Sequence, residues 1–445
     1  MKAAIETMGE FLSMPSNCQS LTLRLEKSGL SHRRFGELTR LDAVRLEPSG
    51  LDFSFSEFEP TLVHLTVTGR CQARCKGCIN AAIAVPCRAD GKKTPPVADT
   101  VPERDAAAIV NLLRHHPDRE GVVCFYGGEP LLAPDSILRI MDDIATAEPG
   151  RPVRYMLYTN GDLLEKVAAT HPELIERLWL ISVSIDGRRD QHEAVRIGLS
   201  LDRIHRGLAA LPPRFPGTVL MWSTLREEQS LADCFAEFMT LHEQGLVRQF
   251  FWHWEETATE FNDLAAYAER YEKDFSAVLD LYLEHLNRGD ILPLVHVNEL
   301  VLYALSGKAR GSSACGVELE GNYDLIDGRI HACADLPIEL AIGSIDPTGN
   351  LVMTPHDLLP LVAYKDDLGC YRCTIHSYCG GRCPVQARIG TPLRLVQYCQ
   401  LMRLHVGLVL ERLDEIIAAI DRHGLTAQQF YDGSAMFAQF TDVTP

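Results

Sequence analysis

Three cysteines in one short segment are the residues of this chain best placed to do chemistry. Cys71, Cys75 and Cys78 lie in the run TGRCQARCKGCIN, at C-x3-C-x2-C spacing, directly after the apolar run LVHLTVT. A [4Fe–4S] cluster takes one thiolate for each iron. Three thiolates on one loop therefore predict a cluster with one iron open to a reactive ligand. The spacing leaves two alternatives open, a zinc site completed by a distant residue or three unrelated thiols.

A second group of cysteines lies toward the C-terminus. Cys370, Cys373, Cys379 and Cys383 follow one another at C-x2-C-x5-C-x3-C spacing. The remaining members of the group are Cys315, Cys333 and Cys399. Seven thiolates divide as four and three between two four-iron clusters. We therefore expect one of these two clusters to lack one cysteine ligand.

The composition indicates a water-soluble protein that uses its cysteines for metal binding. The chain has 445 residues, 14 of them cysteines, and a formal net charge of −17, which argues against nucleic acid as the main partner. It has no apolar run of about 18 residues or more, so we expect no membrane partner. The first residues lack the apolar segment of a secretion signal. Cysteines in a chain without such a signal favour metal ligation, so we expect a cytoplasmic location.

Six short apolar runs alternate with amphipathic stretches in the first half of the chain. The runs span residues 62–68, 121–127, 153–161, 178–187, 218–225 and 247–254. This alternation predicts a parallel sheet, and right-handed crossovers favour a partial (β/α)6 barrel of the TIM type. A doubly wound open sheet is the alternative. A long helix is expected over 262–287 and a final amphipathic helix over 393–422.

Polar and glycine residues follow several of these predicted strands. The second strand ends in the run YGGEP, which contains Gly127, Gly128 and Glu129, and the third ends at Asn160. In barrels of this type, the reactive groups lie at the carboxyl ends of the strands. We therefore expect these residues to lie near the cysteine loop, which follows the first strand.

These motifs together resemble the radical S-adenosylmethionine (SAM) enzymes that carry a C-terminal SPASM domain. The C-x3-C-x2-C loop after the first strand is the signature of that family, and the spacing of the seven later cysteines matches the SPASM pattern. The resemblance implies a [4Fe–4S] cluster on Cys71, Cys75 and Cys78 whose open iron binds SAM. One electron would cleave SAM to a 5′-deoxyadenosyl radical, which abstracts a hydrogen atom from the substrate.

The resemblance also implies which residues contact SAM. Gly127, Gly128 and Glu129 match the GGE motif of the family, in which Glu129 would accept a hydrogen bond from an ammonium group. Asn160, in LYTNG, resembles a position that faces the cofactor, although a simple Asn-Gly turn explains it equally well.

A second pair of residues would hold the carboxylate of SAM. Ser184 and Arg196, in SVSIDGRRDQHEAVR, match family positions with that role, and a guanidinium suits it. For Arg196 the alternative is a surface ion pair with Glu193.

The chain departs from the family just before the third cysteine of the loop. The family usually has an aromatic residue there, beside the cluster and the adenine, and this chain has Gly77. The run FFWHWEE at the end of the sixth strand could supply aromatic surface near the mouth, although such rings more often belong to the core.

The family's interleaved ligation implies three [4Fe–4S] clusters in all, one that binds SAM and two auxiliary ones. The outer auxiliary cluster would use Cys370, Cys373, Cys379 and Cys399. The inner one would use Cys315, Cys333 and Cys383, with an open or non-cysteine fourth position. A fourth ligand from Cys234, Cys87 or a carboxylate would contradict an open position.

Most members of the family modify peptides or proteins. We expect a ribosomally made precursor peptide as substrate, cross-linked, thioether-bridged or oxidised, and an electron donor such as flavodoxin or ferredoxin. A radical dehydrogenase or epimerase of a small alcohol or sugar is one alternative.

The sulfatase-maturing type is another alternative. In that type an Asp that acts as base directly follows the cysteine that matches Cys333. Here that position is Ala334, which leaves Asp335 as candidate base; its alternative is a loop carboxylate. A non-catalytic iron–sulfur or zinc scaffold would have no need of the SAM contacts.

These assignments divide the chain into four parts. We expect an N-terminal extension of unknown role over 1–60 and a radical SAM barrel over 61–290. A SPASM domain with little regular structure would follow over 291–400. A C-terminal helix and tail would complete the chain over 401–445.

Overall fold

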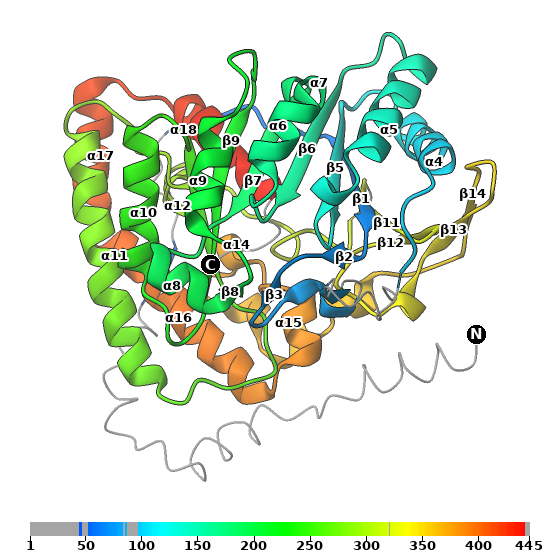
Figure 1. The fold of residues 1–445 in the computed structure, drawn as a ribbon. Coiled ribbons are helices and arrows are strands. Elements are labelled where there is room, and N and C mark those ends of the chain that lie inside the picture. The colour runs from blue at the N-terminus through cyan, green and yellow to red at the C-terminus, as the bar shows by residue number, and fades with distance from the viewer. Residues whose placement is uncertain (1–43, 47–51, 83–84, 87–96, 320, 441–445) are drawn as a thin grey trace.

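A ten-stranded sheet forms the centre of the protein (Figure 1). The structure is a computed structural model. It describes residues 44–46, 52–82, 85–86, 97–319 and 321–440. Most of the N-terminal extension expected over residues 1–60, and Cys87, therefore lie outside the described residues.

Six parallel strands make up the larger part of the sheet. They are β1 (Thr61–Thr68), β5 (Gly121–Gly127), β6 (Val153–Thr159), β7 (Leu178–Ser184), β9 (Thr218–Leu225) and β10 (Gln249–Trp254). Their spatial order, β10-β9-β7-β6-β5-β1, follows the chain without reversal. A doubly wound sheet would reverse its order at a switch point. The predicted partial (β/α)6 barrel is confirmed, and the doubly wound alternative is wrong.

Helices cover one face of these strands (Figure 1). The main ones are α4 (Pro102–His115), α5 (Pro134–Ala147), α6 (Leu164–Thr170), α9 (Leu201–Ala209), α10 (Leu231–Glu243) and α11 (Leu264–Leu286). Their ends follow common capping rules. Ser230 accepts a hydrogen bond from the backbone of Asp233 at the start of α10, and Asp263 accepts one from Ala266 at the start of α11. The predicted helix over 262–287 corresponds to α11.

Side chains alternate between the two faces of the strands, as a period of two requires. On β1, Val63 and Leu65 pack into the large core under the helices. Leu62 belongs instead to a second core on the inner face, where it meets Val122 of β5 and Met156 of β6. Both faces of the sheet are therefore buried, which explains why the strands are nearly continuous apolar runs.

The C-terminal third of the chain closes the inner face. Its cysteine-rich part contains α12 (Val295–Ser306), α13 (Tyr364–Asp367), α14 (His376–Cys379) and α15 (Pro384–Ile389). Val385, Leu395 and Phe440 pack in the same core as the inward side chains of the strands. Residues from the end of the chain thus form part of the barrel interior.

Four further strands extend the sheet beyond β1. β11 (Asn322–Ile326) pairs parallel with β1, and β12 (Arg329–His331), β13 (Gly343–Ile345) and β14 (Leu351–Met353) follow as antiparallel strands. The sequence pattern did not predict β11. It is short, and its register beside β1 depends on residues far away along the chain.

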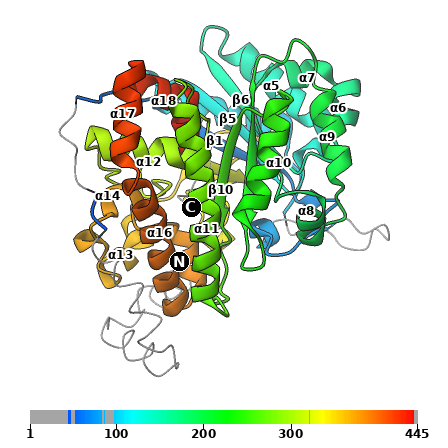
Figure 2. The same ribbon diagram turned by 90° about the vertical axis from the view of Figure 1, so that its left-hand side faces the viewer.

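The helix expected over 393–422 is two helices. α16 (Pro392–Leu410) begins at the cap Thr391, and α17 (Leu413–His423) follows after a break at Arg412, whose φ and ψ are −107° and 4°. Both pack against α11 (Figure 2). The prediction of a single helix is wrong because an unbroken amphipathic pattern does not reveal where a helix must turn to remain packed against the neighbouring helix.

The described part of the chain ends with α18 (Ala427–Gly433) and a 3-10 turn (Ala435–Phe440). No helix in the described parts of the chain is long and apolar enough to cross a lipid bilayer.

The large core under the helices, called the outer core below, predicts that two leucines differ widely in their contribution to the free energy of unfolding. Leu157 of β6 is fully buried, whereas Leu359 is 64% exposed. We expect Leu157→Ala to lower the free energy of unfolding by about 3 kcal/mol because it leaves a cavity. Leu359→Ala, the matched control, should change it by less than about 0.5 kcal/mol. Urea unfolding followed by circular dichroism measures both, and equal losses would contradict the assigned packing.

Candidate functional site

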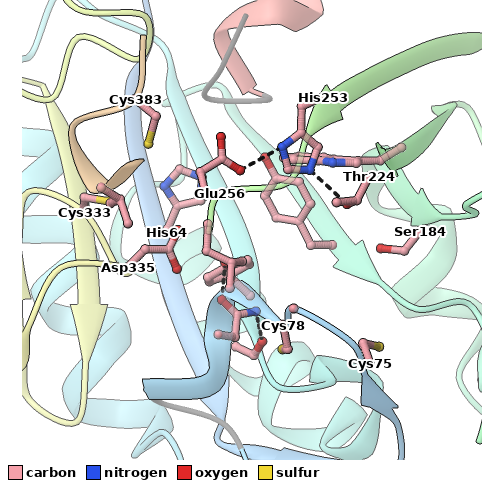
Figure 3. Close-up of a pocket in the computed structure, with 18 of the residues that line it drawn as sticks. His64, Cys75, Cys78, Ser184, Thr224, His253, Glu256, Cys333, Asp335 and Cys383 are labelled. Carbon is pink, nitrogen blue, oxygen red and sulfur yellow. Dashed lines mark hydrogen bonds and ion pairs between the residues drawn. The ribbon is translucent and has the colours of Figure 1, made fainter. Parts of the chain in front are cut away.

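A cavity lies where the carboxyl ends of the strands meet the cysteine-rich segment (Figure 3). It is lined by Cys71, Cys75 and Cys78 from the loop after β1, and by Cys315, Cys333 and Cys383 from the C-terminal third. In Figure 3, Cys75 and Cys78 lie on one side of the cavity and Cys333 and Cys383 on another. Two groups of thiols that are distant in sequence therefore face one space.

The cysteine loop is held in place by two very short strand pairings. β3 (Arg74–Cys75) pairs antiparallel with β8 (Arg196–Ile197), which sets Cys75 opposite Arg196. β2 (Arg70–Cys71) pairs with β4 (Val85–Pro86). The loop is thus fixed to the element that carries the arginine expected to bind SAM.

Donor groups surround the sulfur atoms of the loop. The backbone N–H of Ala73 lies 3.4 Å from Cys71 Sγ, and Asn160 Nδ2 lies 3.9 Å from the same atom. Arg196 Nη1 lies 3.9 Å from Cys75 Sγ. Burial raises the pKa of the Cys71 thiol to about 12, so a thiolate there needs a metal to hold it. Three thiols among N–H donors fit a negatively charged iron–sulfur cluster.

The two glycines of the GGE motif permit a close backbone approach. A Cβ at Gly127, where φ is +120°, would lie 2.5 Å from the carbonyl oxygen of Thr68, and one at Gly128 would lie 2.3 Å from that of Arg70. Gly128 N–H donates to Thr68 and Glu129 N–H donates to Arg70, at 2.8 and 2.9 Å. The end of β5 can therefore lie against the start of the cysteine loop, and both glycines line the cavity.

Glu129 faces away from the cavity. It is fully buried, and burial raises its pKa to about 7. One carboxylate oxygen accepts hydrogen bonds from Leu131 N–H and Thr159 Oγ1, and the other accepts one from Asn160 N–H at 2.9 Å. In this structure Glu129 joins the ends of β5 and β6. The motif predicts that its carboxylate accepts a hydrogen bond from an ammonium group, and the structure differs from that prediction because the carboxylate is bonded inside the protein.

Asn160 makes the turn considered for it and also borders the cavity. Its side-chain oxygen accepts a hydrogen bond from the N–H of Asp162, which makes the turn, and another from Gln72 Nε2, both at 3.1 Å. It also lines the cavity. Asn160 therefore links the end of β6 to the cysteine loop.

The buried carboxylate of Asp186 organises the opposite wall. It binds Arg196 through two bonds of 2.7 and 3.0 Å, and Arg226 Nη1 lies 3.2 Å away. It also accepts a bond from the N–H of Thr224. Burial alone would raise the pKa of Asp186, but the two guanidinium groups hold it well below its usual range. Asp186 is therefore ionised.

Arg196 and Ser184 both reach the cavity. Arg196 pairs with Asp186, and not with Glu193, which instead accepts a bond from the N–H of Leu201. Arg226 donates two hydrogen bonds, of 3.1 and 2.7 Å, to the carbonyl oxygen of Lys76. The network around Asp186 thus holds the cysteine loop and Arg196 together.

The aromatic rings near the cavity come from five strands, and the FFWHWEE run supplies one of them, His253. In that run Phe250, Phe251, Trp252 and Trp254 are fully buried, as core rings. The cavity is lined by one inward-facing ring from each of five strands. These rings are His64, Tyr126, Tyr158, Trp222 and His253. Sequence reasoning missed His64, Tyr126, Tyr158 and Trp222. The signal was the alternation of side chains along each strand, which puts these rings on the same face as the other inward-facing residues.

The seven C-terminal cysteines lie in two groups. Cys315, Cys333 and Cys383 interact electrostatically with one another and line the cavity. The second group is also within electrostatic range of its own members. It consists of Cys370, Cys373, Cys379 and Cys399. The structure thus brings the cysteines together in the four-plus-three division expected from the sequence.

Two carboxylates accompany the inner group of cysteines. Asp335 and Asp324 both line the cavity and interact electrostatically with Cys333. Cys234 lies elsewhere, in the outer core, where Gln191 Nε2 is 3.3 Å from its sulfur. Within the described residues, no three His, Cys, Asp or Glu side chains converge closely enough to bind a single metal ion.

Comparison with known proteins relates the first part of the chain to one family. Residues 65–229 match the family model described as the radical SAM superfamily. No curated protein matches the chain.

Solved structures share the fold over most of the chain. One, described as native anSMEcpe with bound AdoMet, has 17% identity and a TM-score of 0.59, and covers 81% of this chain and 99% of its own. Another, anSMEcpe with bound AdoMet and Cp18Cys peptide, has 18% identity and a TM-score of 0.57, with 82% and 100% covered. Streptococcus suis SuiB has 16% identity and a TM-score of 0.45, with 74% of each chain covered. The first two show a shared fold.

The Asp186 network predicts a pH-dependent contribution to stability. Because the pKa of Asp186 is lowered in the folded protein, its stabilisation is present above the ordinary value of 3.8 and is lost as the pH falls through and below it. At neutral pH, Asp186→Asn should cost about 3–5 kcal/mol of unfolding free energy, since it leaves Arg196 and Arg226 without a buried counter-charge.

Denaturant unfolding at pH 7 and near pH 3.5 measures this difference. The gap between the parent and Asp186→Asn should narrow at the lower pH. Asp414→Asn, at an exposed position on α17, is the control and should change stability by less than about 0.5 kcal/mol. A gap that is constant across this range would contradict an ionised Asp186.

Proposed function

Because residues 65–229 match the radical SAM family model, we propose that this chain is a radical SAM enzyme that modifies a peptide substrate. In this proposal it generates a 5′-deoxyadenosyl radical from SAM and oxidises, cross-links or thioether-bridges the peptide. One observation carries the proposal. The three cysteines of the loop and three cysteines of the C-terminal third line the same cavity.

Cys71, Cys75 and Cys78 would hold the first [4Fe–4S] cluster. When bound, this cluster supplies the electron that cleaves SAM. The residues of the chain have the tasks of orienting SAM and excluding water. The N–H groups near Cys71 and Cys75 would lower the negative charge on the sulfur atoms.

The walls beside the loop would bind the methionine part of SAM. The backbone at Gly127 and Gly128 borders the cavity and would lie beside the ammonium group. Arg196, held by Asp186 and next to Cys75, would bind the carboxylate together with Ser184. A guanidinium fixed by a buried carboxylate is well suited to this task because it loses little freedom on binding.

The two C-terminal groups of cysteines would hold auxiliary clusters. Cys315, Cys333 and Cys383 would bind the inner one, which borders the substrate space, and Asp324 or Asp335 lies within reach as a fourth ligand. The outer one would use Cys370, Cys373, Cys379 and Cys399. Cys399 is exposed, which suits electron exchange with a donor such as flavodoxin or ferredoxin.

A peptide is the substrate class that the shared fold favours. The fold is shared with a protein described with a bound peptide as well as AdoMet. Asp335 borders the cavity beside Cys333 and remains our candidate for the base that takes a proton from the substrate (Figure 3). It lies one residue later than the corresponding Asp of the sulfatase-maturing type, where this chain has Ala334.

Anaerobic reconstitution with iron, sulfide, SAM and a reductant tests the proposed chemistry. The parent should form 5′-deoxyadenosine, measured by chromatography and mass spectrometry. Cys75→Ala should abolish its formation because the SAM-binding cluster loses a ligand. Cys124→Ala, at a buried cysteine of β5 that does not line the cavity, should leave it nearly unchanged. Absence of 5′-deoxyadenosine from the reconstituted parent would refute the proposal.

Iron content tests the number of clusters. The parent should bind about twelve iron atoms per chain, four for each of three clusters. Cys379→Ala should lose about four of them and keep the others, since it removes a ligand of the outer cluster alone. Cys124→Ala is again the control. If the parent holds only about four iron atoms, the auxiliary clusters are ruled out while the SAM-binding cluster remains.

A further inference from the structure

The space beside the third cysteine of the loop is taken by a carboxylate. Gly77, which precedes Cys78, has φ of +56°, and a Cβ built on it would lie 1.4 Å from Glu255 Oε1. No side chain at residue 77 can coexist with Glu255 in this position. Glu255, which follows the sixth strand, therefore occupies the place that a side chain at residue 77 would otherwise take.

Glu255 is held firmly at this place. Its N–H donates to the carbonyl oxygen of Leu225 at 3.0 Å, and its own carbonyl oxygen accepts hydrogen bonds from Tyr398 and Arg394. Its carboxylate lies 3.5 Å from Arg226, the residue that also binds the loop at Lys76. The side chain is 16% exposed and lines the cavity. Glu255 thus presents a carboxylate to the cavity from a rigid support.

The order of groups around the cavity indicates what meets this carboxylate. The ends of β5 and β6 offer Gly127, Gly128 and Asn160, and the β7–β8 side offers Ser184 and Arg196. In the function proposed above, these two walls bind the methionine part of SAM. The adenosine part is then left with the wall made by β9 and β10, where Glu255 lies.

We propose that Glu255 is a positioning residue for SAM, which accepts a hydrogen bond from the adenosine part in the space left by Gly77. The donor is the 6-amino group of the base or a hydroxyl of the ribose. A carboxylate is a strong acceptor for either of them. The proposal rests on the proposed function, since it takes SAM as the ligand.

Binding of stable ligands to the reconstituted holoenzyme tests this role without turnover. Equilibrium dialysis would measure the Kd of SAM and of 5′-deoxyadenosine for the parent, Glu255→Ala and Glu255→Gln. We expect Glu255→Ala to weaken both about tenfold, because it removes a hydrogen bond to a charged group. Glu255→Gln should lose less, since its amide oxygen still accepts. Glu284→Ala, at an exposed position of α11, is the control.

Two analogues identify the donor. 5′-Deoxyinosine lacks the 6-amino group, and 2′,5′-dideoxyadenosine lacks one ribose hydroxyl. If the base is the donor, the parent binds 5′-deoxyinosine about tenfold more weakly than 5′-deoxyadenosine, and Glu255→Ala loses this preference. If the ribose is the donor, the same pattern appears with 2′,5′-dideoxyadenosine. Equal affinities of the parent and Glu255→Ala for every ligand would overturn the proposal.

A double-mutant cycle tests the shared space. Gly77→Ala alone should weaken SAM binding, because its Cβ collides with Glu255. The same change in the Glu255→Ala background should cost less, although the strain at positive φ remains. Additive effects would overturn the claim that the two residues compete for one place.

Iron content and 5′-deoxyadenosine formation distinguish a failure of the proposed function from a failure of the role of Glu255. If both persist in all variants while binding does not change, only the role of Glu255 fails.

Discussion

The arrangement of the cavity depends on one buried carboxylate with two guanidinium partners. Asp186 fixes Arg196 beside Cys75, and it fixes Arg226, which in turn holds the carbonyl oxygen of Lys76. A short loop with three cysteines has almost no core of its own. Its position is therefore set by these charge-assisted bonds and by the backbone contacts of Gly128. Because the charges are buried and mutually neutralised, the network favours a single geometry.

An open barrel of six strands needs a cover on its inner face, and the cover here carries chemistry. The C-terminal third packs Val385, Leu395 and Phe440 against the inward side chains of the strands. The same packing brings Cys333 and Cys383 to the cavity. Closure of the core and placement of the second cysteine group thus depend on the same part of the chain. Any change that loosens this cover would also move the cysteines away from the loop after β1.

Glycine is used in the loop and its surroundings to let other groups approach. Gly128 allows the end of β5 to touch the loop, and Gly77 makes room for Glu255. In both cases the missing side chain matters because of what occupies its space. Glu129 shows the opposite case: a motif residue whose carboxylate is used entirely inside the protein, between β5 and β6. The backbone of Gly127 and Gly128, and not the carboxylate of Glu129, therefore borders the cavity at the end of β5.

The sequence alone determined the six parallel strands, the cysteine loop and the division of the later cysteines, because period, turn residues and spacing are local properties of the chain. Tertiary structure alone decided three other features. It set β11 beside β1, turned the carboxylate of Glu129 away from the cavity, and put Glu255 into the space beside Gly77. Each depends on which distant segments compete for one position, and local sequence carries no record of that competition. The same limit explains the break between α16 and α17, where a helix must turn to remain on α11.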